Sequence, residues 1–111
     1  MQQYPEKSNE VDQLITNKML KKAALEGKKT QQRRHGVCGY PGECFNLDGV
    51  EFEITALKQK KLGDMTEADA VAEGFDSMEA YKELIMKMHK GMPWNPEAKL
   101  WVHKFRRSDR V

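Results

Sequence analysis

The chain has 111 residues, of which 39% are hydrophobic and 32% are charged; this length and composition fit one soluble globular domain with a modest core. No apolar run approaches the roughly 20 residues that span a bilayer, and the polar segment 1–8 lacks the apolar core of a secretory signal. These features argue against an integral membrane protein, so we expect no membrane partner and a cytoplasmic location.

Charge is unevenly distributed along the chain, although the formal net charge is only +2. Segment 18–34 carries seven Lys or Arg residues against one Glu, whereas segment 64–83 carries seven carboxylates against one Lys. Segment 99–110 is basic again. Two basic blocks that meet on one face would attract a phosphate backbone, with an affinity that falls as salt rises.

The first predicted element is an amphipathic helix over 9–26, because apolar residues recur there at helical spacing. Ser8 or Asn9 is placed to cap its start, and Gly27 is placed to end it. The apolar stripe consists of Val11, Leu14, Ile15, Met19, Ala23 and Ala24.

A strongly polar strand over 27–34, Gly-Lys-Lys-Thr-Gln-Gln-Arg-Arg, follows this helix. Alternation along the strand gives one face to Lys29, Gln31 and Arg33. The opposite face receives Lys28, Thr30, Gln32 and Arg34. Cations and amides are poor core material, but they suit a pocket for a phosphate, a nucleobase or a polar carbonyl group.

A β-hairpin is predicted next. Strands over 43–47 and 50–57 flank Asp48-Gly49, a dipeptide that favours two-residue hairpin turns. One face of the second strand receives the apolar residues Val50, Phe52, Ile54 and Ala56. The loop 35–42 before the hairpin carries Tyr40, whose ring is placed to flank a ligand cleft.

Two helices and a final strand complete the predicted elements. Thr66 and Asp69 have capping-box spacing for a short helix that ends at Glu73, because Gly74 follows it. The apolar stripe of the next helix is typical of core packing and includes Met78, Tyr81, Leu84 and Ile85. A strand over 100–105 comes last, and Trp94 in the loop before it is placed to stack on a base.

Metal-binding residue types are present without metal-binding spacing. The histidines and cysteines are His35, Cys38, Cys44, His89 and His103, and their intervals match no standard zinc site or Cys-x-x-Cys motif. We therefore expect two reduced thiols, no metal and no other cofactor. The sequence also lacks a phosphate-cradling P-loop and a serine nucleophile elbow.

The order of these motifs resembles a known family. A leading helix, a Gly-x-Lys-x-x-x-x-Arg strand and a Pro-Gly turn precede the hairpin; segments 62–66 (Leu-Gly-Asp-Met-Thr) and 72–75 (Ala-Glu-Gly-Phe) follow it. Over about residues 10–106 the chain is similar to the ASCH domain (activating signal cointegrator homology) of the PUA-like superfamily. The resemblance implies an α+β fold: a small curled β-barrel of five to six mostly antiparallel strands, with helices covering its openings. Residues 1–9 are then a flexible N-terminus and residues 107–111 a basic C-terminal tail.

The same resemblance implies activities. ASCH domains serve in RNA metabolism as RNA-binding modules, and some small stand-alone members are N4-acetylcytidine amidohydrolases or single-strand ribonucleases. The amidohydrolase motif places a catalytic lysine at Lys29 and a catalytic glutamate at Glu73. Its assisting threonine falls at Gln32, whose amide hydrogen-bonds a carbonyl or a base edge but cannot ionise. A lysine attacks only when neutral, so this function requires that the pKa of Lys29 be lowered by burial and by neighbouring cations.

Three functions stay open from the sequence: amide hydrolysis of N4-acetylcytidine to cytidine and acetate, which leads, single-strand RNA cleavage, and RNA binding without catalysis. Both hydrolytic functions use the Lys29/Glu73 cleft, and the ribonuclease adds the C-terminal basic block to hold the RNA backbone. In the binding module, Lys29 and Arg34 hold phosphate. The expected partner is RNA or a modified pyrimidine nucleoside, bound by a monomer or weak dimer. The predicted binding residues are Lys28, Thr30, Arg34, Tyr40, Trp94, Arg106 and Arg107.

Overall fold

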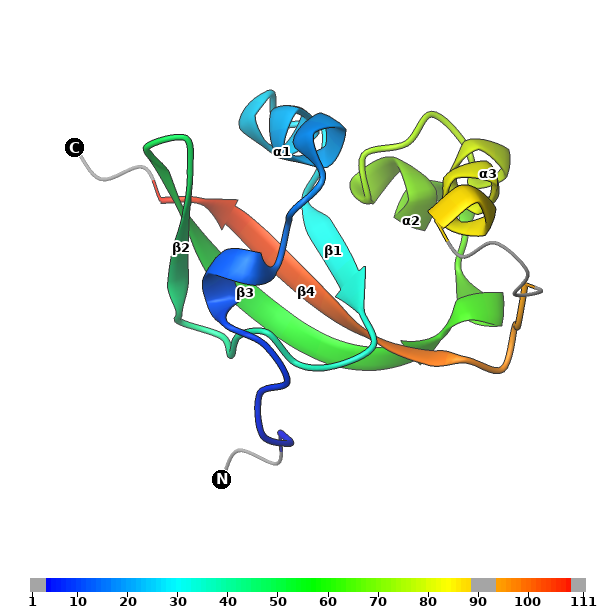
Figure 1. The fold of residues 1–111 in the computed structure, drawn as a ribbon, viewed down its shortest axis with the longest axis horizontal. Helices are drawn as coiled ribbons and strands as arrows, with labels where there is room; N and C mark the ends of the chain where they lie inside the picture. The colour runs from blue at the N-terminus through cyan, green and yellow to red at the C-terminus, as the bar shows by residue number, and fades with distance from the viewer. Residues whose placement is uncertain (1–3, 89–93, 109–111) are drawn as a thin grey trace.

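An antiparallel sheet in the order β1-β4-β3-β2 frames the computed structural model, which describes residues 4–88 and 94–108 (Figure 1). Its strands are Gln31–Arg34 (β1), Cys44–Leu47 (β2), Val50–Lys61 (β3) and Lys99–Arg107 (β4). The long strands β3 and β4 bend across the molecule and curl the sheet into an open half-barrel. The predicted α+β class and curled antiparallel sheet are confirmed, but the described residues form four strands rather than five or six.

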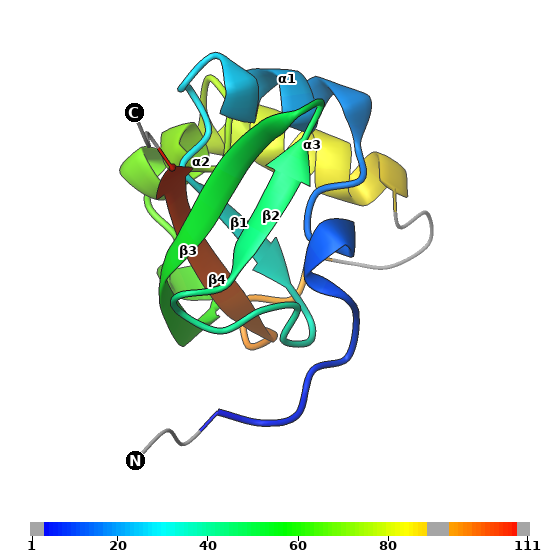
Figure 2. The same ribbon diagram turned by 90° about the vertical axis from the view of Figure 1, so that its left-hand side faces the viewer.

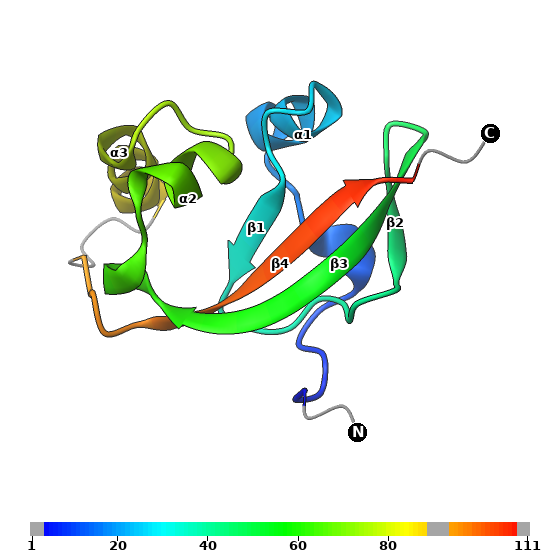
Figure 3. The same ribbon diagram turned by 180° about the vertical axis from the view of Figure 1, so that it is seen from behind.

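Short helices accompany the sheet: η1 (Val11–Gln13), α1 (Lys18–Leu25), η2 (Leu62–Asp64), α2 (Glu67–Ala72) and α3 (Met78–Met88). The three α-helices gather along one side of the curl (Figure 2). Seen from behind, β3 and β4 have no helix in front of them (Figure 3). In the described part of the chain, no helix is both long enough and apolar enough to cross a membrane.

The predicted helix over 9–26 is wrong in its extent, because the segment forms two separate pieces, η1 and α1. Asn17 separates them: its backbone is extended and its side chain accepts hydrogen bonds from the N–H groups of Met19 (2.8 Å) and Leu20 (3.2 Å). An asparagine N-cap of this kind begins a new helix, so α1 is capped by Asn17 rather than by Ser8 or Asn9. Met19 is therefore not part of the core and is 76% exposed.

The predicted hairpin is confirmed at Asp48-Gly49, where both residues have positive φ (49° and 86°), as a two-residue turn requires. A register irregularity between Ile54 and Ala56 then shifts the alternation of β3. Because a bulge turns later side chains over, Leu57 is buried while Ala56 is only half-buried.

Two apolar clusters fill the molecule. The first joins the sheet to η1 and α1, and at its centre the rings of Phe45, Phe52 and Phe105 lie 5.5–5.7 Å apart. The second joins α2 and α3 to the start of β4 through Leu62, Met65, Ala70, Tyr81 and Leu100. The junction between α1, β1 and α2 lies between these clusters, and the polar site forms there.

Residues 4–9 lie against the loop that follows β1. The Ser8 N–H donates to the Val37 carbonyl (2.7 Å), and the Tyr4 and Tyr40 rings stack with centroids 5.8 Å apart. The domain boundaries predicted near residues 10 and 106 stay predictions.

Candidate active site

The polar segment 27–34 is a strand only from Gln31 onward, so the predicted strand is wrong in its start, but its burial alternates as the sequence predicts. Lys29, Gln31 and Arg33 are buried, whereas Lys28 and Thr30 are exposed. β1 is an edge strand whose sheet partner is β4, so its other edge is free to line a cavity. The burial of two cations and an amide within five residues of chain requires compensating partners.

Glu73, the last residue of the α2 region, supplies those partners. The Lys29 Nζ donates to the Glu73 carbonyl oxygen (2.6 Å) and lies 3.6 Å from the carboxylate Oε1. The Gln31 amide donates to Oε2 (2.9 Å), and the Arg33 N–H donates to Oε1 (3.2 Å). The Arg33 Nε lies 3.5 Å from Oε2. These four residues, the Glu73 cluster, are each at most 6% exposed.

Gly74 lets the end of α2 closely approach α1 and the segment just before β1. Its φ is 103°, and a Cβ placed there would lie 3.2 Å from the Lys29 Cβ and 3.3 Å from the Ala23 Cβ. The predicted capping box between Thr66 and Asp69 is present at the start of α2. Cap and glycine together fix both ends of α2, and so fix the position of Glu73.

Burial governs the acid–base properties of the Glu73 cluster. Desolvation lowers the pKa of Lys29 from 10.5 to about 8, against the opposing attraction of Glu73. Desolvation also raises the pKa of Glu73 above its ordinary value, although Lys29, Gln31 and Arg33 oppose this shift. Both shifts favour the neutral forms, which brings the two groups closer to exchanging a proton near neutral pH.

A cavity of about 680 Å³ opens at the free edge of β1; we call it the edge cavity. Its polar wall is formed by Gln32, Arg33, Arg34 and Glu73. Its apolar wall comes mainly from α3 and flanking segments and includes Phe75, Tyr81, Leu84, Ile85, Trp94 and Leu100. Lys29 does not line the edge cavity: its side chain is fully enclosed behind Glu73.

Several predicted site residues therefore lie together. Glu73, Gln32, Arg34 and Trp94 line the edge cavity, with Lys29 directly behind Glu73. Gln32 nevertheless lies on the strand face opposite Lys29. Arg34 is already engaged, because it donates to the carbonyl oxygens of Leu14 (3.1 Å) and Gln13 (2.5 Å).

The other predicted binding residues lie outside the edge cavity. Lys28 is exposed and 3.7 Å from the Glu26 carboxylate, while Tyr40 donates its hydroxyl hydrogen to the Pro5 carbonyl (2.7 Å). Thr30 is exposed, and its N–H donates to Ala72 (2.7 Å). Arg106 and Arg107 are exposed near the end of β4, where Arg106 lies 3.5 Å from Glu53. Figure 1 places this end of β4 on the opposite side of the molecule from α3.

Sequence reasoning did not assign Gln31, Arg33 or Tyr81 to the site. Alternation already placed Gln31 and Arg33 on the face of Lys29, which was the available signal. Tyr81 belongs to the predicted apolar stripe of α3, and burial raises the pKa of its hydroxyl. Nothing in that stripe distinguishes a cavity wall from ordinary core.

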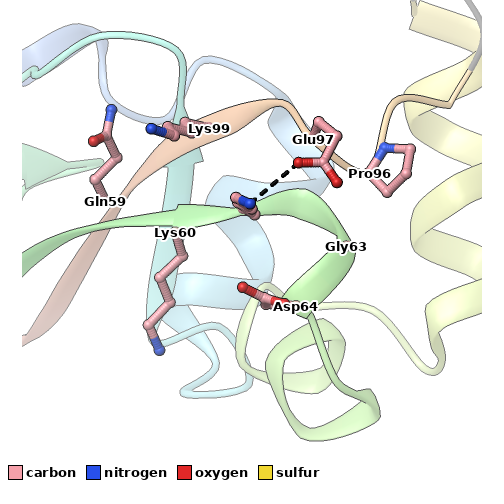
Figure 4. A pocket seen from close by; sticks show the side chains of 8 residues that line it. Gln59, Lys60, Gly63, Asp64, Pro96, Glu97 and Lys99 are labelled. Atoms are coloured by element: carbon pink, nitrogen blue, oxygen red, sulfur yellow. Dashed lines mark ion pairs between the residues drawn. The ribbon is translucent and has the colours of Figure 1, made fainter.

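A second hollow, of about 610 Å³, lies where β3 ends and β4 begins (Figure 4). It is lined by charged residues, and the Lys61 Nζ pairs with the Glu97 carboxylate at 3.1 Å. Figure 4 shows the amines of Lys60 and Lys99 pointing in different directions. It contains no residue of the Glu73 cluster, so the edge cavity is the better candidate active site.

The histidines and cysteines do not form a metal site in the described residues, where no group of three potential ligands converges. Cys38 and Cys44 are both free thiols. His103 is fully buried, and its Nε2 accepts from the Cys38 N–H (3.0 Å). His89 lies outside the described residues.

Comparisons with known proteins agree with the resemblance in fold. No family model and no curated protein sequence matches the chain. An ASCH domain from Lactobacillus crispatus JV V101 matches with a TM-score of 0.59 and 18% identity, over 79% of this chain and 69% of that one. Protein EF3133 from Enterococcus faecalis V583, described as DUF984, matches with a TM-score of 0.58 and 14% identity, over 91% and 73%. The chain therefore shares the α+β fold of this ASCH domain.

Proposed function

We propose that the protein is an amide hydrolase that cleaves N4-acetylcytidine, or a closely related acylated pyrimidine nucleoside, in the edge cavity. The observation that carries this proposal is the burial of Glu73 in the cavity wall, directly in front of the enclosed Lys29. A carboxylate whose pKa is raised by burial is a better base near neutral pH than an exposed one.

The hydrolysis follows from this arrangement. Glu73 takes a proton from a water molecule, and the water oxygen attacks the acetyl carbon. The bond between that carbon and N4 then breaks, and Glu73 returns the proton to N4. The products are cytidine and acetate, and no oxidant or cofactor is needed.

Lys29 acts through Glu73 in this mechanism, because its side chain does not reach the edge cavity. Its Nζ holds the Glu73 backbone by a 2.6 Å hydrogen bond, and its charge state controls that of the carboxylate. Lys29 is therefore a positioning residue, and direct attack by its amine is disfavoured by this geometry.

Release of cytidine from N4-acetylcytidine, followed by chromatography, tests the proposal. We expect Glu73→Gln to lower kcat by about 100-fold or more, because general base catalysis contributes that much. We expect Lys29→Met to lower kcat as well, because Lys29 positions Glu73; Lys28→Met, at the exposed neighbour, is its matched control. Absence of turnover by the wild type, or equal turnover by Glu73→Gln, would overturn the proposal.

Recognition of single-stranded RNA, with or without cleavage, is the second candidate. The observation that favours it is a set of exposed cations on β3 and β4, namely Lys58, Lys61, Lys99, Lys104, Arg106 and Arg107. Lys61 and Lys99 are direct cross-strand partners; the Glu97 carboxylate already pairs with Lys61 at 3.1 Å, so this like-charge pair is partly offset within the protein.

A labelled RNA oligomer separates this candidate from the first. We expect an Arg106→Ala/Arg107→Ala variant to bind it more weakly, with a shallower dependence of affinity on salt. Lys18→Ala, at an exposed lysine of α1, serves as the control. Equal affinity of all these proteins for the RNA would exclude this surface.

A further inference from the structure

Arg33 is the feature of the edge cavity that the proposed hydrolysis leaves unused. Its side chain is 2% exposed, yet its Nη1 has no hydrogen-bond partner in the described residues. Its Nη2 lies 3.8 Å from the Asp69 carboxylate, and its Nε lies 3.5 Å from Glu73. A buried guanidinium with an unsatisfied N–H is costly, so this position favours a ligand that brings an acceptor oxygen.

Gln32 lies next to Arg33 in the same wall and has an unsatisfied acceptor, where Arg33 has an unsatisfied donor. Its Nε2 donates to the Arg33 carbonyl (3.2 Å), but its buried Oε1 has no hydrogen-bond partner among the described residues. An amide oxygen in this state favours a ligand that brings an N–H donor. Arg33 and Gln32 together therefore match a group that carries both C=O and N–H.

The charges around Arg33 indicate that this group is neutral. Lys29 and Arg33 face Glu73 and Asp69 within 3.8 Å, and these four charges sum to zero when all are ionised. Arg34 is a further cation in the cavity wall, but its guanidinium already donates to two backbone carbonyl oxygens. An added carboxylate or phosphate would lie beside Glu73 and be repelled. A neutral carbonyl oxygen accepts from the guanidinium without that penalty.

The remaining wall of the edge cavity is mostly apolar, although Asn9, His35 and Asn95 also line it. Phe75, Tyr81, Leu84 and Ile85 line it opposite the polar residues, and Tyr81 packs edge-on to Trp94 with centroids 6.2 Å apart. Such a wall binds a flat apolar body. The ligand therefore has a neutral amide at one end and a ring or other apolar group at the other.

We propose that Arg33 is a substrate-binding residue that holds the carbonyl oxygen of a neutral amide, while Gln32 accepts the amide N–H and the α3 wall holds the apolar part of the ligand. The assignment rests on the proposed amide hydrolysis for its biological substrate. It concerns binding alone, however, so it can be measured without turnover.

Acetanilide and N-ethylaniline form a matched pair of probes, because both carry a benzene ring and an N–H but only acetanilide has the carbonyl oxygen. The indole N–H resonance of Trp94 reports binding, since Trp94 lines the edge cavity. We expect the wild type to bind acetanilide about tenfold more tightly, the preference that a hydrogen bond to a charged donor gives. Arg33→Met should abolish this preference. Lys18→Met, at an exposed position on α1, should retain it.

Two further measurements keep the outcome decisive if Arg33→Met does not fold. Arg33→Lys retains the positive charge but loses the planar fork of donors, and we expect it to lose most of the preference. In the wild type, the Arg33 Nε–H resonance should shift with acetanilide and not with N-ethylaniline. Equal binding of both probes by the wild type, binding of neither, or an unchanged preference in Arg33→Lys would overturn the assignment. Failure to hydrolyse N4-acetylcytidine would instead overturn the proposed function and leave this preference standing.

Discussion

At the scale of single residues, the Glu73 cluster shows how a chain buries charge. Lys29 and Glu73 are each 1% exposed, and moving such ions out of water costs several kcal/mol each unless hydrogen bonds replace the lost hydration. Here the carboxylate accepts from Gln31 and from the Arg33 backbone, and Lys29 donates to a carbonyl. Several hydrogen bonds within the Glu73 cluster, rather than one ion pair, therefore compensate the hydration that is lost on burial.

A double-mutant cycle tests whether Lys29 and Glu73 stabilise each other. We expect Lys29→Met to lower the free energy of unfolding by about 3 kcal/mol, because it leaves a buried carboxylate with one cation fewer. Once Glu73→Gln has removed the charge, the same change should cost at least about 1 kcal/mol less. Urea denaturation measures both steps, with Lys28→Met as the exposed control. Equal costs for Lys28→Met and Lys29→Met would contradict the coupling.

At the scale of elements, local chemistry that repeats with a fixed period could be predicted from the sequence. Alternation in β1, the Asp48-Gly49 turn and the capping box of α2 all follow from a few adjacent residues. The break before α1 could not be predicted, because the apolar stripe continues through Asn17 and only the cap reveals the interruption. The bulge in β3 likewise leaves no mark on the pattern.

Gly74 offers an element-scale prediction, because it packs the end of α2 against α1 and the segment before β1. Gly74 and Gly42 have similar positive φ values (103° and 97°), but only at Gly74 would a Cβ meet neighbours. Gly42→Ala should cost about 1 kcal/mol from the backbone alone. Gly74→Ala should cost at least about 1 kcal/mol more, since Ala23 and Lys29 must move, and it should also lower hydrolysis of N4-acetylcytidine. Thermal unfolding of both variants checks the difference; equal costs would show that the close approach is unimportant.

At the scale of the whole molecule, the candidate active site lies where the two apolar clusters meet, and it combines residues from β1, α2 and α3. The family resemblance predicted that Lys29 and Glu73 belong to one cleft, and the two residues do lie together. Periodicity alone could not have brought them together, because 44 positions separate them. Nor could it show that Lys29 lies behind the cavity wall, because that depends on how closely α2 packs on β1.

The enclosed Lys29 gives the folded protein a pH dependence that an exposed lysine would not. Its pKa falls from 10.5 to about 8 on folding, so in this interval the unfolded chain binds a proton that the folded protein has released. Stability therefore rises with pH, by about 2 kcal/mol between about pH 8 and about pH 10. Above that range the trend reverses, because burial raises the pKa of Tyr81 and the unfolded chain loses that proton first. Urea denaturation of the wild type should show the rise, and Lys29→Met should lack it while Lys28→Met retains it. A flat profile in the wild type would mean that Lys29 keeps its proton when buried, because the attraction of Glu73 outweighs the desolvation of the ammonium group.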